Sequence, residues 1–154
     1  MSLFGGLDIS ASALSAERLR MDVTAENLAN AQSTRTANGG PYRRKEVVLE
    51  STGGGGFASA LASARAGSAG GGSSAGGANG GVRVAGIVED QTPNRLVYDP
   101  GNPDANAQGY VSMPNVNPVT EMVDLISASR SYEANVTAMQ TTKQMFTKTL
   151  DLLR

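Results

Sequence analysis

The sequence predicts a mainly α-helical fold with a small β-containing insert, in which N- and C-terminal helices pair as a coiled coil that is incomplete without neighbouring subunits. Three observations predict this class. Large apolar residues recur at every seventh position near both ends, and the middle is rich in Gly, Pro, Asn and Asp. Large apolar side chains are also few for a chain of 154 residues, because aromatic residues make up only 5% and Trp is absent. A single compact core would be under-supplied, so neighbouring chains are expected to complete it.

The N-terminal segment, residues 1–33, is expected to be one helix that runs from about Phe4 to Ala31. The turn-forming sequence Asn-Gly-Gly-Pro at 38–41 follows it and favours a stop. Positions one heptad apart along this helix carry the large apolar residues Leu7, Leu14, Met21 and Leu28.

The C-terminal segment, residues 117–154, is expected to be a longer helix. Asn117 can cap its first free N–H groups, and Pro118 has no N–H to leave unpaired at the first helical position. No Gly or Pro follows, so the helix would be roughly 50 Å long. The predicted helix–helix seam uses its heptad positions, Met122, Leu125, Tyr132, Val136, Met139, Phe146, Leu150 and Leu153.

The middle, residues 34–116, is expected to be an irregular insert with some β structure. Residues 42–51 and 82–91 contain alternating apolar residues and are candidate strands. Between them, residues 53–81 form a Gly/Ser/Ala tract that cannot bury enough apolar area to offset its ordering entropy, so we expect a flexible loop. Residues 92–115 are rich in turn-forming residues and are expected to be irregular, including the short apolar run at 95–98.

The insert returns the chain, so the two terminal helices most simply pair antiparallel. The apolar stripe of the C-terminal helix is longer than that of its partner by more than a heptad. Part of it would therefore be exposed on a single chain, and a neighbouring subunit is expected to cover it.

Charge and composition exclude several classes of function. The net charge is −1 and the charges are mixed, so the basic stripe that captures nucleic acid is missing. The Arg-Arg-Lys run at 43–45 is expected to be a solvated strand face or loop. With no Cys and no His, the chain has no thiolate or imidazole metal ligand and no His general base. It has no secretory signal and no apolar stretch of the roughly 20 residues that cross a bilayer, so conventional signals indicate the cytosol.

Two candidate ligand sites fail on their own residues. The glycine tract lacks the Lys of a phosphate-binding P-loop. Asn102, Asp104 and Asn106 have the spacing of a calcium loop, but Ala107 and Met113 stand where Gly and Glu are required. A surface loop with Asx turns is the interpretation that remains.

Two further patterns have structural explanations. Glu121 and Asp124 suit the positive end of a helix dipole and need not be a catalytic carboxylate pair. The Met and aromatic residues of the C-terminal helix could line a ligand groove, but their heptad spacing favours a helix seam. The sequence therefore predicts no enzyme activity, no cofactor, no metal and no small-molecule substrate.

Six short stretches resemble the signatures of the flagellar axial rod and hook family, of the proximal-rod type: residues 27–31, 40–45, 97–105, 109–111, 113–117 and 130–135. They cover both ends and most of the centre, and the chain departs from the family at the long glycine tract. We expect Asn27 and Asn30 to cap a helix, to bond to a neighbouring subunit, or simply to end the helix. The residues that carry the resemblance are Asn27, Asn30, Pro41, Tyr42, Tyr98, Pro100, Asn102, Pro103, Pro114, Asn115, Tyr132 and Asn135.

The resemblance implies a structural subunit of the bacterial flagellar basal-body rod, which assembles helically and transmits torque from motor to hook. The implied partners are other rod proteins and copies of itself, the basal membrane ring with its rod-base adaptor, and the flagellar export apparatus, with no nucleic acid. The implied location is the periplasm-spanning rod, reached by export from the cytoplasm without a cleaved signal peptide. The helix stripes alone would also fit a soluble coiled-coil adaptor or export chaperone that does not polymerise.

Overall fold

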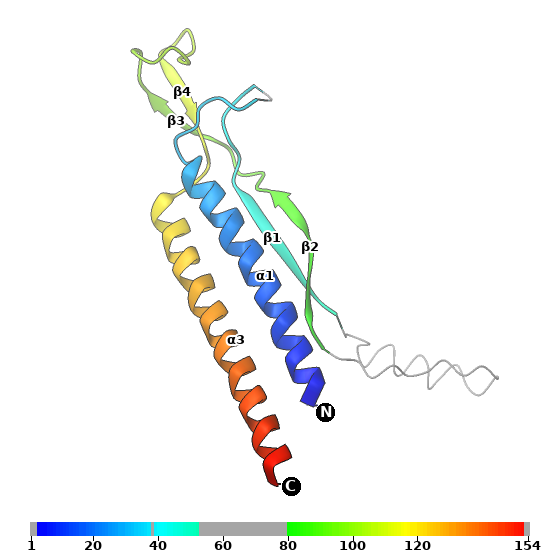
Figure 1. Cartoon of the computed structure of the whole chain (residues 1–154). Coiled ribbons are helices and arrows are strands. Elements are labelled where there is room, and N and C mark those ends of the chain that lie inside the picture. The colour runs from blue at the N-terminus through cyan, green and yellow to red at the C-terminus, as the bar shows by residue number, and fades with distance from the viewer. Residues whose placement is uncertain (1–2, 38, 53–79, 153–154) are drawn as a thin grey trace, which may run out of the picture.

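The computed structural model describes residues 3–37, 39–52 and 80–152. The order of elements is α1 (Leu3–Ala29), β1 (Lys45–Ser51), β2 (Val82–Glu89), β3 (Arg95–Tyr98), β4 (Tyr110–Met113) and α3 (Pro118–Leu152). Figure 1 shows a long helix at each end of the chain and two hairpins between them. The predicted class, a mainly helical chain with a small β-containing insert, is confirmed.

The two helices lie side by side and run in opposite directions (Figure 1), so the predicted antiparallel pairing is confirmed. α3 has 35 residues and α1 has 27, and the C-terminal end of α3 extends past the N-terminal end of α1. The β1–β2 hairpin lies along the other side of α1. α1 is therefore the middle of three neighbouring elements.

The start of α3 has the predicted cap. The Asn117 Oδ1 accepts a hydrogen bond from the backbone N–H of Val119 at 3.1 Å, and the Asn117 carbonyl accepts one from the N–H of Glu121 at 3.0 Å. Asn117 is thus the N-cap and Pro118 is the first helical residue. This cap fixes where the first turn of α3 lies.

After α1 the chain reverses through a turn that places Tyr42. The backbone N–H of Thr36 donates to the carbonyl of Gly40 at 2.8 Å, and that of Tyr42 donates to the carbonyl of Ser33 at 3.1 Å. Gly40 has a φ of 120°, a conformation that side chains with a Cβ rarely adopt. The turn brings the Tyr42 ring back against the end of α1.

The β1–β2 hairpin is antiparallel, with Lys45 opposite Glu89 at one end and Ser51 opposite Val82 at the other. Side chains alternate between the two faces of the hairpin, and Val47, Val82 and Val84 are half-buried. The N–H of Val82 donates to the hydroxyl of Ser12 at 3.1 Å, which ties the hairpin to α1. Most of the predicted flexible loop, residues 53–79, lies outside the described residues.

The second hairpin pairs β3 with β4, so the run at 95–98, which we expected to be irregular, is a strand. Val97 and Val111 lie opposite each other, and Val111 is buried, which gives this short pair an apolar face. Gly109, with a φ of 80°, closes the turn beside Tyr98, where a Cβ would lie 2.9 Å from the Tyr98 ring. The turn therefore requires glycine at this position.

The buried apolar set is small among the described residues. Its members are Ala16, Val23, Ala31, Tyr42, Val111, Val116 and Ala128. Three of these are alanines, which remove little apolar surface from water. Ala31, Tyr42 and Val116 form a cluster where the end of α1, the approach to β1 and the approach to α3 meet. Over the same residues, neither helix is long and apolar enough to cross a membrane.

Candidate functional site

The Asn27 side chain lies at the centre of a buried polar junction, which we define as Asn27, Tyr42, Arg44, Asn115 and Glu121. Asn27 is 1% exposed. Its Nδ2 donates to the carbonyl of Lys45 at 2.8 Å and to the Glu121 Oε2 at 3.0 Å. Its Oδ1 accepts from the Tyr42 hydroxyl and from the N–H of Lys45, both at 2.9 Å. Two donors and two acceptor positions are the full capacity of an asparagine amide, so this side chain is completely satisfied inside the chain.

Glu121 is equally buried, at 1% exposed, and is paired with a cation. The Arg44 Nε donates to the Glu121 Oε1 at 2.6 Å, and an Arg44 terminal nitrogen lies 3.5 Å from the Asp124 Oδ2. The hydrogen bond to Glu121 raises the pKa of the Arg44 guanidinium above its already high ordinary value. A buried carboxylate is costly unless it is both paired and hydrogen-bonded, and here it is both.

Asn115 joins the remaining segments to the polar junction. Its Oδ1 accepts from the backbone N–H of Arg44 at 2.8 Å, and its Nδ2 donates to the carbonyl of Thr92 at 3.3 Å. The backbone N–H of Asp90 also donates to the carbonyl of Arg44, at 2.8 Å. The junction thus connects α1, the approach to β1, the segment after β2 and the approach to α3.

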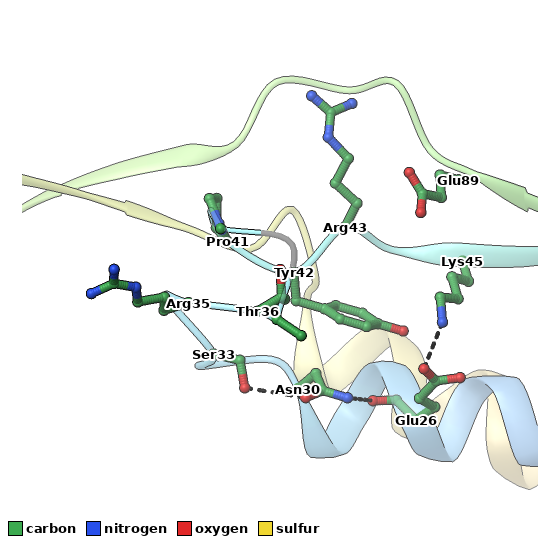
Figure 2. Close-up of a pocket in the computed structure, with 12 residues that line it drawn as sticks. Glu26, Asn30, Ser33, Arg35, Thr36, Pro41, Tyr42, Arg43, Lys45 and Glu89 are labelled. Atoms are coloured by element: carbon green, nitrogen blue, oxygen red, sulfur yellow. Dashed lines mark hydrogen bonds and ion pairs between the residues drawn. The ribbon is translucent and has the colours of Figure 1, made fainter. Parts of the chain in front are cut away.

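Tyr42 forms the wall between the polar junction and an open hollow of about 520 Å³. In Figure 2 its ring lies between the loop above and α1 below, and Lys45 and Glu26 face each other beside it. The Lys45 Nζ lies 2.6 Å from the Glu26 Oε1 and 5.6 Å from the centre of the Tyr42 ring. Burial, followed by the charges of Glu26, Glu121 and Glu89, raises the pKa of Tyr42 to about 12. The hydroxyl therefore stays a donor to Asn27.

Among the residues that the structure describes, the lining of the hollow is charged but mixed in sign. Its lining combines the cations Arg35, Arg43 and Lys45 with the acids Glu26 and Glu89. The Ser33 hydroxyl, which also lines it, donates to the Asn30 Oδ1, an amide oxygen that cannot act as a general base. Nucleophilic catalysis requires a nucleophile–base pair.

The β3–β4 hairpin uses the polar residues that had calcium-loop spacing. Asn102 Oδ1 accepts from the N–H of Asp104 and Asn106 Oδ1 from the N–H of Gln108, both in Asx turns. The Asn106 Oδ1 also accepts from the N–H of Tyr110, four residues on. The Asp104 Oδ2 accepts from the Thr34 hydroxyl at 2.8 Å. These oxygens stabilise the turn and tie it to the segment after α1.

The residues that carry the family resemblance lie in four places. Asn27, Tyr42, Pro114 and Asn115 lie at or beside the polar junction, and Pro114 is fully buried. Tyr98 packs edge-to-face on Tyr110, with ring centroids 5.3 Å apart, in the hairpin whose turn contains Pro100, Asn102 and Pro103. Pro41 lines the hollow beside Tyr42, and Tyr132 and Asn135 lie in the middle of α3.

These contacts correct the sequence expectations for Asn27 and Arg44 and, for Asn30, agree with one of the stated alternatives. Asn27 does not cap a helix or reach a neighbouring subunit, because its whole hydrogen-bonding capacity is used inside the chain. Asn30 has the plain helix-end role, since its Nδ2 donates to the carbonyl of Glu26 at 3.0 Å. Arg44 is not solvated like Arg43, because its side chain is 24% exposed and holds Glu121.

The face of α3 toward α1 is displaced from the predicted heptad positions. Leu125, Tyr132 and Met139 are half-buried, but Met122 is 44% exposed. The second heptad line of covered residues begins at Glu121, one position before the predicted Met122. It continues through Ala128, Asn135 and Thr142. The small side chain of Ala128 and the hydrogen bond from Asn27 to Glu121 account for this rotation, because both bring that side of α3 close to α1.

The other seam candidates are placed as follows. Val136 is half-buried, Phe146 is 38% exposed and Leu150 is 51% exposed, while Leu153 lies outside the described residues. On α1 the half-buried candidates are Leu7, Leu14, Met21 and Leu28. Over the described residues, the exposed fraction of the seam candidates on α3 therefore rises from Val136 toward its C-terminal end.

Sequence reasoning missed Arg44 and Glu121 as partners. The signal that could have found them is the line Glu121, Ala128, Asn135, Thr142, which has heptad spacing and runs beside the large apolar line. A heptad line without large side chains allows two helices to approach closely. An acidic residue that is buried at the start of such a line needs a cation as its partner. That cation comes from a segment 77 positions away in sequence, and spacing along one helix cannot reveal it.

Comparison with known proteins identifies the family of this chain. The family described as "Flagella basal body rod protein" matches residues 7–35, and that described as "Flagellar basal body rod FlgEFG protein C-terminal" matches residues 107–152. The flagellar basal-body rod protein FlgC of Bacillus subtilis is 53% identical over 156 residues, covering 99% of each chain. The FlgC proteins of Escherichia coli O157:H7 and Borreliella burgdorferi are 46% and 41% identical, over 99% and 100% of this chain and 98% and 99% of theirs. With relatives this similar over almost the whole length, the chain belongs to the FlgC family of flagellar basal-body rod proteins.

Proposed function

We propose that this chain is a structural subunit of the flagellar basal-body rod, in its proximal part, and is not an enzyme. The single observation that carries the proposal is the match to FlgC proteins over nearly the full length of both chains. In this proposal the subunit assembles helically with other rod proteins and with copies of itself, and the assembly transmits torque from motor to hook.

Torque transmission requires an assembly that resists twisting, and long helices packed side by side contribute such stiffness. α3 has 35 residues and is therefore roughly 50 Å long. It packs on α1, which is backed by the β1–β2 hairpin. The polar junction holds one end of the helix pair through directional hydrogen bonds, which fix how far one helix can slide along the other.

The subunit also presents apolar surface that an assembly would cover. The proposed seam with α1 uses Leu125, Tyr132, Met139, Phe146 and Leu153. A neighbouring subunit would cover the part of the C-terminal stripe that extends past α1. Few apolar side chains are buried among the described residues, so contacts between subunits add burial that one chain cannot provide.

The proposed neighbours beyond the rod are the basal membrane ring with its rod-base adaptor, and the flagellar export apparatus. In this view the chain leaves the cytoplasm through that apparatus without a cleaved signal peptide and resides in the periplasm-spanning rod. Family membership supports the basal-body location, and the export route extends the proposal beyond it.

Purification of basal bodies from cells that carry a tagged copy of the chain tests the proposal. A rod subunit should remain with the basal bodies through detergent extraction and sedimentation, in a fixed ratio to the other rod proteins. A tagged chain found only in the soluble fraction, with basal bodies intact, would contradict the proposal and favour a non-polymerising adaptor or export chaperone.

A further inference from the structure

The side of α3 opposite the polar junction has an exposed face that combines apolar and charged side chains. Glu121, which bonds to Asn27 of α1, and the fully buried Ala128, seven positions on, mark the side that packs on α1. Each residue advances about 100° around an α-helix, so positions two, five and nine residues from Ala128 lie on the other side. We call these exposed residues the outer face of α3: Val119, Val123, Ile126, Arg130, Glu133 and Thr137.

α1 also has a side that is not used within the described part of the chain. Asn27 marks the side that contacts α3, and Ser12, which bonds to Val82, marks the side that contacts the β1–β2 hairpin (Figure 1). A third line of residues recurs at spacings of three and four and is exposed along its whole length. We call it the open face of α1: Ala11, Ser15, Arg18, Asp22, Ala25 and Ala29.

The charges on the two faces are complementary when the helices run antiparallel. Along α3 the outer face has Arg130 followed by Glu133, and along α1 the open face has Arg18 followed by Asp22. All four side chains are exposed, and none forms an ion pair with another described residue. An antiparallel alignment places Asp22 against Arg130 and Arg18 against Glu133. A parallel alignment places like charges together or matches only one pair, so the charges select the antiparallel one.

The same alignment covers the apolar part of the outer face. It places Ala25 against Ile126 and Ala29 against Val123, in a register that agrees with both charge pairs to within one residue. Ile126 and Val123 are 54% and 60% exposed in the single chain. The alanines opposite them have short side chains, which lets the two helices approach closely enough to remove this apolar surface from water.

We propose that the outer face of α3 packs on the open face of α1 of a second copy of this chain, with Asp22 of the second copy against Arg130. The inference deepens the proposed function and rests on it, since copies of a rod subunit lie side by side. Charge complementarity identifies the occupant as a second copy, because this chain itself carries both matching patterns. The contact cannot form within one chain, because its own α1 packs on the opposite side of α3.

The register also gives the displacement between the two copies. Within one chain Asn27 lies level with Glu121, so Asp22 lies level with Ile126. In the proposed contact Asp22 of the second copy lies level with Arg130, four residues farther along α3, which is about 6 Å. A contact between two different faces that repeats with such an axial step builds an open helix rather than a closed ring.

A pair of introduced cysteines tests the contact in assembled basal bodies. The chain has no native Cys, and Ala25→Cys with Ile126→Cys leaves the four charges in place. Mild oxidation should link copies of this double variant into disulfide-bonded multimers, because the two positions come within the reach of a disulfide only between copies. The matched control is Ala25→Cys with Thr137→Cys, which lies on the same face but about 16 Å from the expected position, and it should remain monomeric, as should each single variant.

Three outcomes of the cysteine experiment would overturn the contact. They are monomers only, equal linking in the control, and a disulfide within one chain, each observed in basal bodies that contain the variant. All three would leave the rod assignment intact. Basal bodies that lack the wild-type chain altogether would instead refute the proposed function.

Exchange of the charges gives a second readout. Arg130→Glu places two carboxylates together in the proposed contact and should lower the number of complete basal bodies per cell by about tenfold. Adding Asp22→Arg restores opposite charges and should recover most of the loss, whereas Arg95→Glu, at an exposed arginine of β3, should have no effect. Circular dichroism of the purified variants should match the wild-type chain, because these side chains are exposed. A double variant that assembles no better than Arg130→Glu would refute the pairing of Asp22 with Arg130.

Discussion

The side-chain amide of Asn27 in α1 donates a 3.0 Å hydrogen bond to the carboxylate of Glu121 in α3, and both residues are 1% exposed. The two residues are 94 positions apart in the sequence. The bond therefore joins the end of one terminal helix to the start of the other. A buried polar pair between helices costs stability in general but fixes which residues face each other, because any other alignment leaves both groups unsatisfied.

Removal of the Asn27 amide should destabilise the chain strongly. Asn27→Ala leaves the Glu121 carboxylate, the Tyr42 hydroxyl and the Lys45 backbone groups without this hydrogen-bond partner. Because these groups are then buried and unsatisfied, the free energy of unfolding should fall by about 3–5 kcal/mol. Urea unfolding followed by far-ultraviolet circular dichroism measures the loss. Asn30→Ala is the control, since Asn30 bonds only near the helix end. Equal losses for the two variants would show that the junction does not stabilise the fold.

Arg44 and Arg43 are adjacent, and substitution of each should give very different results. Arg44→Gln leaves Glu121 buried without its cation and should cost about 2–3 kcal/mol, while Arg43→Gln, at an exposed side chain, should cost less than about 0.5 kcal/mol. Adding Glu121→Gln to Arg44→Gln removes the unpaired charge, so the double variant should recover part of the loss. A double variant whose loss equals the sum of the two single losses would mean that the pair is not coupled.

Tyr42 should make stability fall at alkaline pH. Its pKa in the folded chain is about 12, above the ordinary value of 10.0, so the folded state keeps the phenol proton longer than the unfolded state does. The contribution of Tyr42 is therefore complete below pH 10 and is lost as the pH rises toward 12. The measurement is the difference in unfolding free energy between the wild-type chain and Tyr42→Phe across this range. The difference should shrink as the pH rises, and a constant difference would contradict the buried, donating hydroxyl.

Alanine substitutions of two glycines in the β3–β4 turn should have different effects on stability. Gly109→Ala forces a Cβ to within 2.9 Å of the Tyr98 ring at a φ of 80°, and should loosen the hairpin by about 1–2 kcal/mol. Gly101→Ala adds only an ordinary contact, at 3.6 Å from the Asp99 Oδ1, and should be tolerated. Near-ultraviolet circular dichroism of the Tyr98–Tyr110 pair reports the change. An unchanged tyrosine signal in Gly109→Ala would show that the turn does not depend on glycine.

The sequence was sufficient to predict the elements that depend on local pattern. Asn117 and Pro118 predicted the start of α3, and the heptad lines predicted two terminal helices, because caps and periodicity act within a few residues. The same signals could not predict the rotation of α3 that buries Glu121 and exposes Met122. That rotation depends on Asn27 and Arg44, which come from distant parts of the chain.

The second hairpin was missed for a related physical reason. Four residues at 95–98 have too few alternating side chains to outweigh the surrounding Pro, Asn and Gly signals. The strand forms because Val97 finds Val111 across the ladder and because Gly109 allows the turn to close beside Tyr98. Pairing of this kind depends on tertiary contacts rather than on local propensity.

Deletion of the gene, followed by electron microscopy of hook-basal bodies and a swimming assay, tests the central claim most directly. A structural rod subunit predicts loss of the rod above an intact membrane ring, loss of swimming, and recovery of both when a wild-type copy is supplied. Intact flagella and normal swimming in the deletion strain would contradict the rod assignment.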